Sequence, residues 1–88
     1  MPAWFLYIVR CSDNTLYTGI AKDVEKRVGE HNTSDTLGAK YTKSRRPVQL
    51  VYKESHPSRS AAAQREHQIK KMTKQQKENI IALSLSHQ

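Results

Sequence analysis

Residues 4–20 read WFLYIVRCSDNTLYTGI, and this stretch predicts a β-hairpin. Its two ends, 4–10 and 16–20, are rich in the aromatic and β-branched residues that strands favour. The polar run 12–15 between them suits a turn. Two antiparallel strands are therefore expected to open the domain. The sequence does not fix their register, so it leaves open whether Tyr7 and Tyr17 share a face.

The residues after the hairpin predict a helix followed by a long loop. Asp23 is a plausible N-cap, and apolar residues recur at helical spacing until Asn32 ends the helix. Residues 33–47 show no apolar periodicity and mix Ser, Thr and Gly with cations. We expect a basic, mobile loop there.

The second half of the chain predicts one more strand and two helices. Residues 48–53 are rich in β-formers and should be the third strand. Ser58 or Ser60 can cap a helix through an alanine-rich stretch to Met72. A capping box at residues 73–76 then starts a last helix that runs through position 83.

The expected order of elements is β-β-α-β-α-α. It predicts an α+β fold in which a small three-stranded antiparallel sheet is flanked by helices. With 88 residues, the chain is expected to be a single domain, 1–88, with its core at about residues 4–81.

Net charge favours a polyanionic partner. Fifteen Lys and Arg stand against eight Asp and Glu, which gives a formal net charge of +7. A positive field over a domain this small attracts nucleic acid first of all. The alternative is a generically basic protein whose charge names no function.

Other site classes are excluded by composition. Cys11 is the only cysteine, so neither an internal disulfide nor a cysteine-rich zinc cluster is possible, and a reducing compartment fits best. The four histidines do not fall at zinc-ligand spacings, and no glycine-rich phosphate loop is present. The longest apolar run, 4–9, is far short of the ~20 residues that cross a bilayer. We expect a cytoplasmic protein with no membrane partner.

Two polar residues fall on the apolar face of the first helix. At about 100° per residue, Arg27 and His31 lie in the same arc as Val24 and Val28. Taken alone, Arg27 can be explained by snorkelling past the valines or by pairing with a carboxylate. His31 can likewise be a satisfied residue at the helix end.

The alanine-rich helix repeats this pattern with a carboxylate. Glu66 is the acidic residue on a stripe that also contains Ala62, Ile69 and Thr73. A half-buried carboxylate is unfavourable unless it is paired or bound to a metal. A salt bridge from Glu66 to Arg27, in a protein whose partner is another protein, would explain both residues without catalysis.

These residues together resemble the GIY-YIG nuclease superfamily. The first family tripeptide appears as Leu6-Tyr7-Ile8 and the second as Tyr17-Thr18-Gly19. The helix motif reads KRVGEHN at 26–32, and the acidic helix reads AQRE at 63–66. The set is most similar to the small stand-alone bacterial members of the YhbQ type, and the helix is also similar to that of Slx-type endonucleases. Leu6 replaces a family glycine and Thr18 an isoleucine, which removes no catalytic group.

The resemblance implies a site. It places Tyr7 and Tyr17 side by side near an attacking water, Arg27 at the scissile phosphate and His31 in an assisting position. Glu66 would bind one divalent metal ion, Mg²⁺ or Mn²⁺, since a single carboxylate leaves most of the ion's shell to water and phosphate.

Two further positions match the family less directly. Gly19 would permit a close approach to the backbone. Asn79 matches, at a loose spacing, a polar residue near the end of the family domain. The basic loop supplies the expected nucleic-acid grip through four cations: Lys40, Lys43, Arg45 and Arg46.

The function implied is a metal-dependent endonuclease that hydrolyses phosphodiester bonds in DNA, which suits a role in DNA repair. No separate DNA-reading module fits in the chain, so we expect no sequence specificity. Single-stranded and branched DNA are the candidate preferred substrates, and RNA stays an alternative. The competing hypothesis is a nucleic-acid-binding module that kept the fold and lost turnover.

Overall fold

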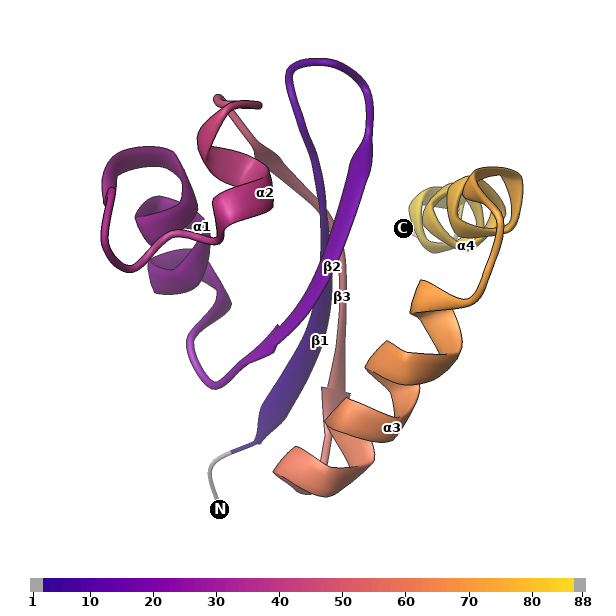
Figure 1. Ribbon diagram of the computed structural model, residues 1–88. Coiled ribbons are helices and arrows are strands. Elements are labelled where there is room, and N and C mark those ends of the chain that lie inside the picture. Colours follow the sequence, from indigo (N-terminus) through magenta and orange to yellow (C-terminus); the bar gives the residue numbers. More distant parts are fainter. Residues whose placement is uncertain (1–2, 87–88) are drawn as a thin grey trace.

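The sheet is the centre of the molecule. The computed structural model describes residues 3–86 and contains three strands, β1 (Trp4–Arg10), β2 (Leu16–Ala21) and β3 (Gln49–His56). All pairings are antiparallel, and the strand order β2-β1-β3 puts the first strand in the middle. In Figure 1 the sheet is seen from the β2 edge, with β2 in front of the other two strands.

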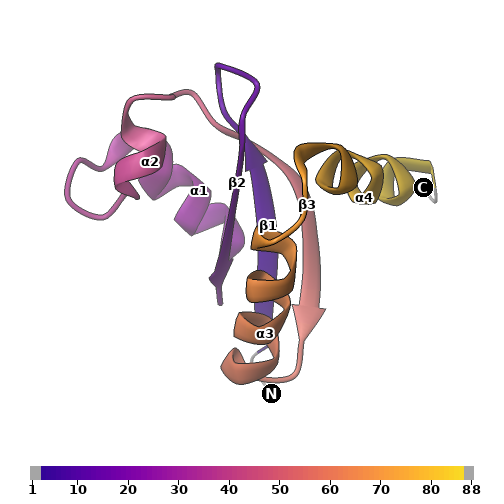
Figure 2. The same ribbon diagram turned by 45° about the vertical axis from the view of Figure 1, so that its right-hand side comes forward.

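Helices cover both faces of this sheet. On one side lie α1 (Val24–Thr33) and the short α2 (Lys40–Lys43), as Figure 1 shows on the left. On the other side lie α3 (Arg59–Lys70) and α4 (Lys74–Ser86). Figure 2 shows α3 lying across the sheet and α4 extending away from it. The expected α+β fold with a three-stranded antiparallel sheet is confirmed.

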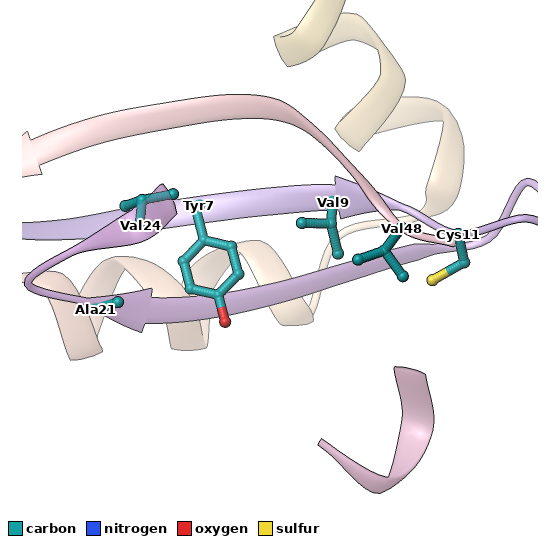
Figure 3. Close-up of a cluster of buried hydrophobic side chains, with 6 residues drawn as sticks. All are labelled: Tyr7, Val9, Cys11, Ala21, Val24 and Val48. Atoms are coloured by element: carbon teal, nitrogen blue, oxygen red, sulfur yellow. The ribbon is translucent and has the colours of Figure 1, made fainter. Parts of the chain in front are cut away.

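The central strand supplies both hydrophobic cores, because successive side chains of a strand point to opposite faces. Leu6 and Ile8 pack with Ile69 and Ile81 on the α3 and α4 side. Tyr7 and Val9 face the α1 side. The cluster on that side, drawn in Figure 3, is made of Tyr7, Val9, Cys11, Ala21, Val24 and Val48.

The helix starts follow the capping residues of the sequence. The Asp23 side chain accepts a hydrogen bond from the Lys26 amide at the start of α1. Of the two serines considered for α3, Ser58 is the cap. The capping box is confirmed in both directions, since Thr73 and Gln76 each accept a bond from the other's backbone amide, at 3.2 and 2.9 Å.

Several element ends differ from expectation. The third strand continues to His56, beyond the expected end at position 53. The α3 helix stops at Lys70, where the chain bends toward the capping box, and α4 reaches Ser86. None of the described helices is long and apolar enough to cross a membrane.

Residues 33–47, expected to be a mobile loop, are not loop throughout, because they contain the α2 helix. The end of the segment is tied to α1 by side chains. Arg46 donates to the backbone carbonyls of His31 and Ser34, at 2.6 and 2.8 Å. The Asn32 amide group both donates to and accepts from the backbone of Val48. These bonds give the segment an ordered backbone despite its polar composition.

Candidate active site

The hairpin register places the two tyrosines on one face. Tyr7 pairs with Gly19, and Tyr17 pairs with Val9, two positions along the same strand as Tyr7. Because Tyr7 and Val9 point to the same side, Tyr17 points there too and is a diagonal neighbour of Tyr7. The question that the sequence left open is thus settled by the pairing.

Gly19 makes room for the Tyr7 ring. A Cβ atom added at Gly19 would lie 2.5 Å from the Tyr7 hydroxyl oxygen and 2.7 Å from Cζ. Figure 3 shows the ring reaching from β1 to β2. The close approach expected at Gly19 is therefore made by a side chain, and it brings the phenol to the β2 edge of the sheet.

His31 lies against both tyrosines at the end of α1. Its side chain is fully buried. The Tyr7 hydroxyl and His31 Nε2 are 2.8 Å apart, a hydrogen-bond distance. The imidazole also meets the Tyr17 ring edge-on, with a centroid separation of 5.3 Å. The helix face that mixed apolar residues with a histidine therefore delivers that histidine to the tyrosines.

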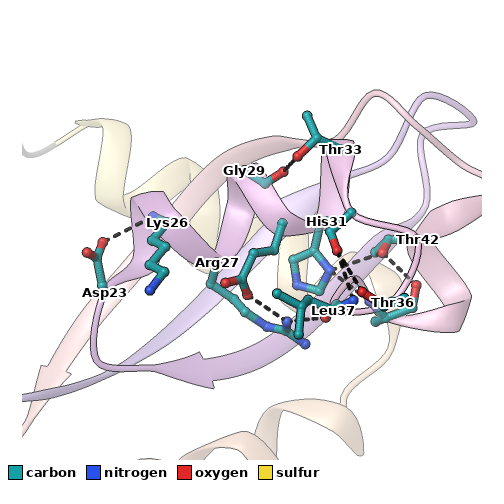
Figure 4. Close-up of polar contacts among 12 residues, drawn as sticks. Asp23, Lys26, Arg27, Gly29, His31, Thr33, Thr36, Leu37 and Thr42 are labelled. Carbon is teal, nitrogen blue, oxygen red and sulfur yellow. Dashed lines mark hydrogen bonds and ion pairs between the residues drawn. The ribbon is translucent and has the colours of Figure 1, made fainter.

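Thr42 on α2 sets the tautomer of His31. The Thr42 hydroxyl lies 2.9 Å from the Ala39 carbonyl, to which it donates, and 3.0 Å from His31 Nδ1. Since a hydroxyl has one hydrogen, Thr42 must then accept from Nδ1–H. The competing contact, from the Ala39 amide to Nδ1, is longer at 3.3 Å. We therefore assign the proton to Nδ1, on the side of the ring that contacts Thr42 in Figure 4, which leaves the Nε2 lone pair to accept from Tyr7.

Burial keeps this pair uncharged. It raises the pKa of Tyr7 to about 12 and lowers the pKa of His31 to about 4. The nearby Arg27 guanidinium favours the phenolate of Tyr7, but burial outweighs it. Positive charge alone therefore does not ionise Tyr7, and the residue at rest is a neutral phenol that donates to a neutral imidazole.

Arg27 is half-buried beside the tyrosine. Its Nη1 atom pairs with Glu30 at 3.0 Å and donates to the Leu37 carbonyl (Figure 4). The guanidinium also lies close enough to act on the Tyr7 hydroxyl electrostatically. Arg27 is thus held at the site by its own helix and by the segment that follows it.

Glu66 lies on α3, on the other side of the sheet from α1. Its negative charge disfavours the Tyr7 phenolate and so contributes to the raised pKa of Tyr7, as the smallest of the influences on it. Its ion pair is with Lys70, one turn later on α3, at 3.3 Å. The alternative of a structural bridge between Arg27 and Glu66 is not what the structure shows, because each has its ion partner on its own helix.

The donor set fits a weakly held, hydrated divalent ion. Within residues 3–86 there is no group of three or more His, Cys, Asp or Glu that could enclose a metal. Glu66 has a partly exposed side chain whose ion partner, Lys70, is itself mostly exposed. One open carboxylate matches the preference of Mg²⁺ for keeping several waters.

The four cations of the basic segment divide into two kinds. Lys40 and Lys43 are exposed on α2. Arg46 is committed to the backbone carbonyls of His31 and Ser34 and to an ion pair with Asp35. Of these four cations, only the two lysines are exposed and so accessible to a ligand. Composition alone could not distinguish them from the arginines that hold the fold together.

Arg45 belongs to an aromatic stack beside Tyr17. Its guanidinium lies 4.0 Å from the centroid of the Tyr41 ring, and Tyr41 stacks on Tyr17 with centroids 5.8 Å apart. Asp13 in the hairpin turn pairs with Arg45 at 3.2 Å. The stack holds α2 against the hairpin and fixes the outer side of Tyr17.

Asn79 is not brought to this group of residues. It is exposed on α4, which packs on β3, and its side-chain oxygen accepts from Gln75 at 3.0 Å. Figure 1 places α4 on the opposite side of the sheet from α1.

Sequence reasoning missed four residues that support the site. The ion partners Glu30 and Lys70 lie three and four positions from Arg27 and Glu66, so helical spacing was a usable signal. Tyr41 and Thr42 gave none, because they belong to a four-residue helix whose position depends on tertiary contacts.

A family model and several known proteins match most of this chain. A family model described as the GIY-YIG catalytic domain matches residues 3–79. A UPF0213 protein of Desulfotalea psychrophila is 51% identical over 83 residues, covering 94% of this chain and 74% of that protein. A UPF0213 protein of Staphylococcus aureus is 54% identical over 81 residues, covering 92% of this chain and 96% of that protein.

Solved structures show the same fold. The solution structure of an Enterococcus protein (E. faecalis) matches with a TM-score of 0.63 and 34% identity, covering 97% of this chain and 90% of that one. The solution structure of a UPF0213 protein from Bacillus halodurans matches with a TM-score of 0.59 and 34% identity, covering 92% and 84%.

Proposed function

Since this chain belongs to the GIY-YIG family, we propose that it is a nuclease that hydrolyses phosphodiester bonds in nucleic acid. The observation that carries the proposal is the 2.8 Å contact between the Tyr7 hydroxyl and His31 Nε2. It joins a phenol to a neutral imidazole beside a cation, Arg27, and a carboxylate, Glu66. Hydrolysis needs a proton acceptor, positive charge at the phosphate and a place for a metal ion, and these groups can supply all three.

Arg27 is the residue we assign to the scissile phosphate. Its contacts to Glu30 and to the Leu37 carbonyl both use Nη1. The guanidinium therefore keeps further N–H donors to offer, in the planar arrangement that suits phosphate oxygens. Charge that builds on the phosphate during attack would be stabilised by a group that is already positioned.

Tyr7 and His31 form the proposed proton path. As the attacking water loses a proton to the Tyr7 oxygen, the Tyr7 hydroxyl proton passes to His31 Nε2. The water oxygen bonds to phosphorus as the bond to one ester oxygen breaks, and that oxygen leaves with the bonding electrons and takes a proton from solvent water. Thr42 accepts from His31 Nδ1–H throughout and so supports the imidazolium that forms. This path moves a proton without requiring a free phenolate, which burial disfavours.

Glu66 is the residue that would hold one divalent ion, Mg²⁺ or Mn²⁺. Such an ion, when bound, supplies Lewis-acid charge to the phosphate. Lys70 competes with the ion for the carboxylate through its 3.3 Å ion pair, which is consistent with weak affinity for free metal.

DNA is the proposed substrate, without sequence specificity and with single-stranded or branched forms preferred. The exposed Lys40 and Lys43 would contact the phosphate backbone near Tyr17, and Arg45 would add positive charge beside them. Backbone contacts carry no sequence information, in keeping with a domain this small.

The test is a cleavage assay with matched substrates. Purified protein is incubated with end-labelled single-stranded, duplex and flapped DNA and with RNA, each with Mg²⁺, Mn²⁺ or EDTA. We expect cleavage of DNA that requires a divalent ion and is lost in Glu66→Ala. Glu54→Ala is the matched control, since Glu54 is a half-buried carboxylate bonded to Tyr52, His56 and Arg65 outside the proposed site.

Two results would contradict the proposal. Cleavage that is unchanged in Glu66→Ala would remove the mechanism. Saturable binding of every substrate with no cleavage in either metal would support the alternative, a nucleic-acid-binding module without turnover.

A further inference from the structure

A second group of cations and an aromatic ring lies outside the residues used above. Trp4, at the start of β1, has Lys22 Nζ 5.5 Å and Arg59 Cζ 5.7 Å from its ring centroid. Both distances lie within the ~6 Å over which a cation is attracted to an aromatic ring. The three residues come from β1, from the turn after β2 and from the first position of α3, so the fold brings them together.

The two cations are exposed and their charge is uncompensated. Lys22 and Arg59 are both exposed, while Trp4 is half-buried. Within residues 3–86 neither cation forms an ion pair with a carboxylate, whereas Arg10, Arg27, Arg45, Arg46 and Arg65 all do. A pair of unneutralised cations on an indole is an arrangement suited to an anionic, aromatic ligand.

The cluster lies in line with the proposed site. Lys22 follows Gly19 by three residues, about 10 Å along an extended chain. Arg59 precedes Glu66 by seven residues, two helical turns or about 10 Å along α3. Figures 1 and 2 show α3 lying beside β2 and running in the opposite direction, so both displacements lead toward the same end of the sheet.

One stripe of α3 connects the two places. At about 100° per residue, Arg59, Ala63, Glu66 and Lys70 fall on one side of the helix. The small side chain of Ala63 separates Arg59 from Glu66. A surface depression lined by Arg59, Ala63 and His67 lies beside this stripe, and Glu66 is not part of its lining.

We propose that Trp4, Lys22 and Arg59 form a binding subsite for the nucleic-acid strand next to the scissile phosphate. On binding, the two cations move from the indole face to a backbone phosphate, and the indole then stacks on a base. The inference rests on the proposed function, because it takes the strand to be centred at Tyr7 and Glu66. A separation of about 10 Å corresponds to about three steps along one strand, at 3.4 Å each in duplex geometry.

Tryptophan fluorescence can report binding at the subsite, because Trp4 is the chain's single tryptophan. The experiment uses the Glu66→Ala protein, so that cleavage plays no part, and unlabelled oligothymidylates of increasing length. Trp4 fluorescence is followed during titration, and binding is measured independently by the anisotropy of a fluorescein-labelled oligonucleotide. We expect a saturable change in Trp4 fluorescence that parallels the anisotropy, and no change with inorganic phosphate.

Variants identify the contacts. Lys22→Gln with Arg59→Gln should weaken binding about tenfold and lower the slope of log affinity against log salt by about 0.7, the contribution of one neutralised phosphate on a single strand. Lys26→Gln is the control, since Lys26 is an exposed cation on α1. In cleavage by the otherwise wild-type chain, the double variant should raise KM about tenfold and change kcat less than twofold. Trp4→Phe keeps a ring for packing, and it should bind more weakly than wild type.

The subsite is overturned if anisotropy saturates while Trp4 fluorescence stays constant and the double variant binds like Lys26→Gln. Absence of any nucleic-acid binding would overturn it as well. The fluorescence measurement needs no turnover, so the two proposals can fail separately. If oligonucleotides change Trp4 fluorescence but the wild-type chain cleaves none of the substrates, the nuclease proposal is contradicted and the subsite is supported.

Discussion

At the residue scale, the hydrogen bond between Tyr7 and His31 prepares an uncharged pair for an anionic substrate. Burial keeps the phenol protonated and the imidazole neutral. A phosphate that arrives beside them adds negative charge, which favours the protonated form of His31. The substrate itself thereby makes the imidazole a better proton acceptor.

Tyr7→Phe should therefore abolish most cleavage while the fold is kept. We expect the cleavage rate to fall by about 10²–10⁴, the usual contribution of a positioned proton-transfer group. The ring still fills the core, but His31 Nε2 loses its partner, which should lower the free energy of unfolding by about 1–3 kcal/mol. Single-turnover cleavage and urea unfolding measure the two effects.

Tyr52→Phe is the matched control for this variant. Tyr52 is another strand tyrosine, half-buried where Tyr7 is buried, and its hydroxyl donates to Glu54 at 2.6 Å on the other face of the sheet. It should keep wild-type cleavage. Equal loss of activity in the two variants would argue that general destabilisation, and not proton transfer, explains the effect.

His31 should also make stability depend on pH. The pKa of His31 falls from its ordinary value of 6.5 to about 4 in the folded protein, so the unfolded chain binds the proton more readily. The contribution of His31 to the free energy of unfolding is therefore constant above pH 6.5, and the protein loses stability as the pH falls from 6.5 to 4. The loss should reach about 3 kcal/mol, at 1.36 kcal/mol per pKa unit.

Urea unfolding between pH 4 and 8 measures this slope. His31→Asn should remove most of it, while His67→Asn, at an exposed position on α3, should leave it in place. A wild-type protein equally stable at pH 5 and pH 7 would contradict the assignment. The Arg10 guanidinium holds the pKa of Glu78 at about 2, so Glu78 affects stability in a lower range, as the pH falls below 4.5.

At the scale of single elements, the site depends on the absence of a side chain in β2. Gly19→Ala places a methyl group 2.5 Å from the Tyr7 oxygen, so the ring must move away from the β2 edge. We expect cleavage to fall by at least about 10²-fold, as a displacement of about 1 Å can do. The hydrogen bond from the Tyr7 hydroxyl to His31 should be broken too.

Gly29→Ala provides the control for that change. Gly29 is exposed on α1, and an added Cβ there has nothing within 4 Å. Because glycine weakens a helix interior, this variant should gain about 1 kcal/mol of stability with unchanged cleavage. Full activity in Gly19→Ala would show that Tyr7 does not need its observed position.

Elements governed by neighbouring residues could be predicted from the sequence. The hairpin strands, the Asp23 cap and the capping box at 73–76 each depend on interactions within a few positions. The helix face that carries Arg27 and His31 was also readable, because helical periodicity is local. Local patterns do not show which other element packs against each helix or sheet face.

Tertiary contacts decided the rest of the site. The α2 helix has four residues and no apolar period, and its place is set by Arg46 and by Thr42 bonded to His31. The tyrosine pairing follows from a strand register that only the assembled sheet determines. The roles of Thr42 and Tyr41 were therefore beyond sequence reasoning.

At the scale of the whole molecule, the net charge of +7 predicts binding that weakens steeply with salt. Replacing Lys40 and Lys43 by Gln should lower the salt slope for single-stranded DNA by about 1.4, since each phosphate contact contributes ~0.7. Folding should be unaffected because both side chains are exposed. Anisotropy titrations at several salt concentrations give the slope.

Arg46→Gln should behave in the opposite way. Its guanidinium bonds to the carbonyls of His31 and Ser34, so its loss should destabilise the protein while leaving the salt slope near that of wild type. Thermal unfolding, measured beside the anisotropy titrations, separates the two classes of cation. A salt slope lowered in Arg46→Gln as much as in the lysine variants would contradict the division.

The position of Cys11 gives the molecule a practical use. Cys11 is the chain's only cysteine, and it is buried in the core beside Val9 and Val48. Thiol reagents react with exposed thiolates, so the folded protein should be nearly silent toward them without any cysteine being replaced. A cysteine introduced at the exposed Ser44 or Ser60 would then be the one position that takes a photo-crosslinker. The natural chain is thus already suited to mapping, nucleotide by nucleotide, the path of a bound strand.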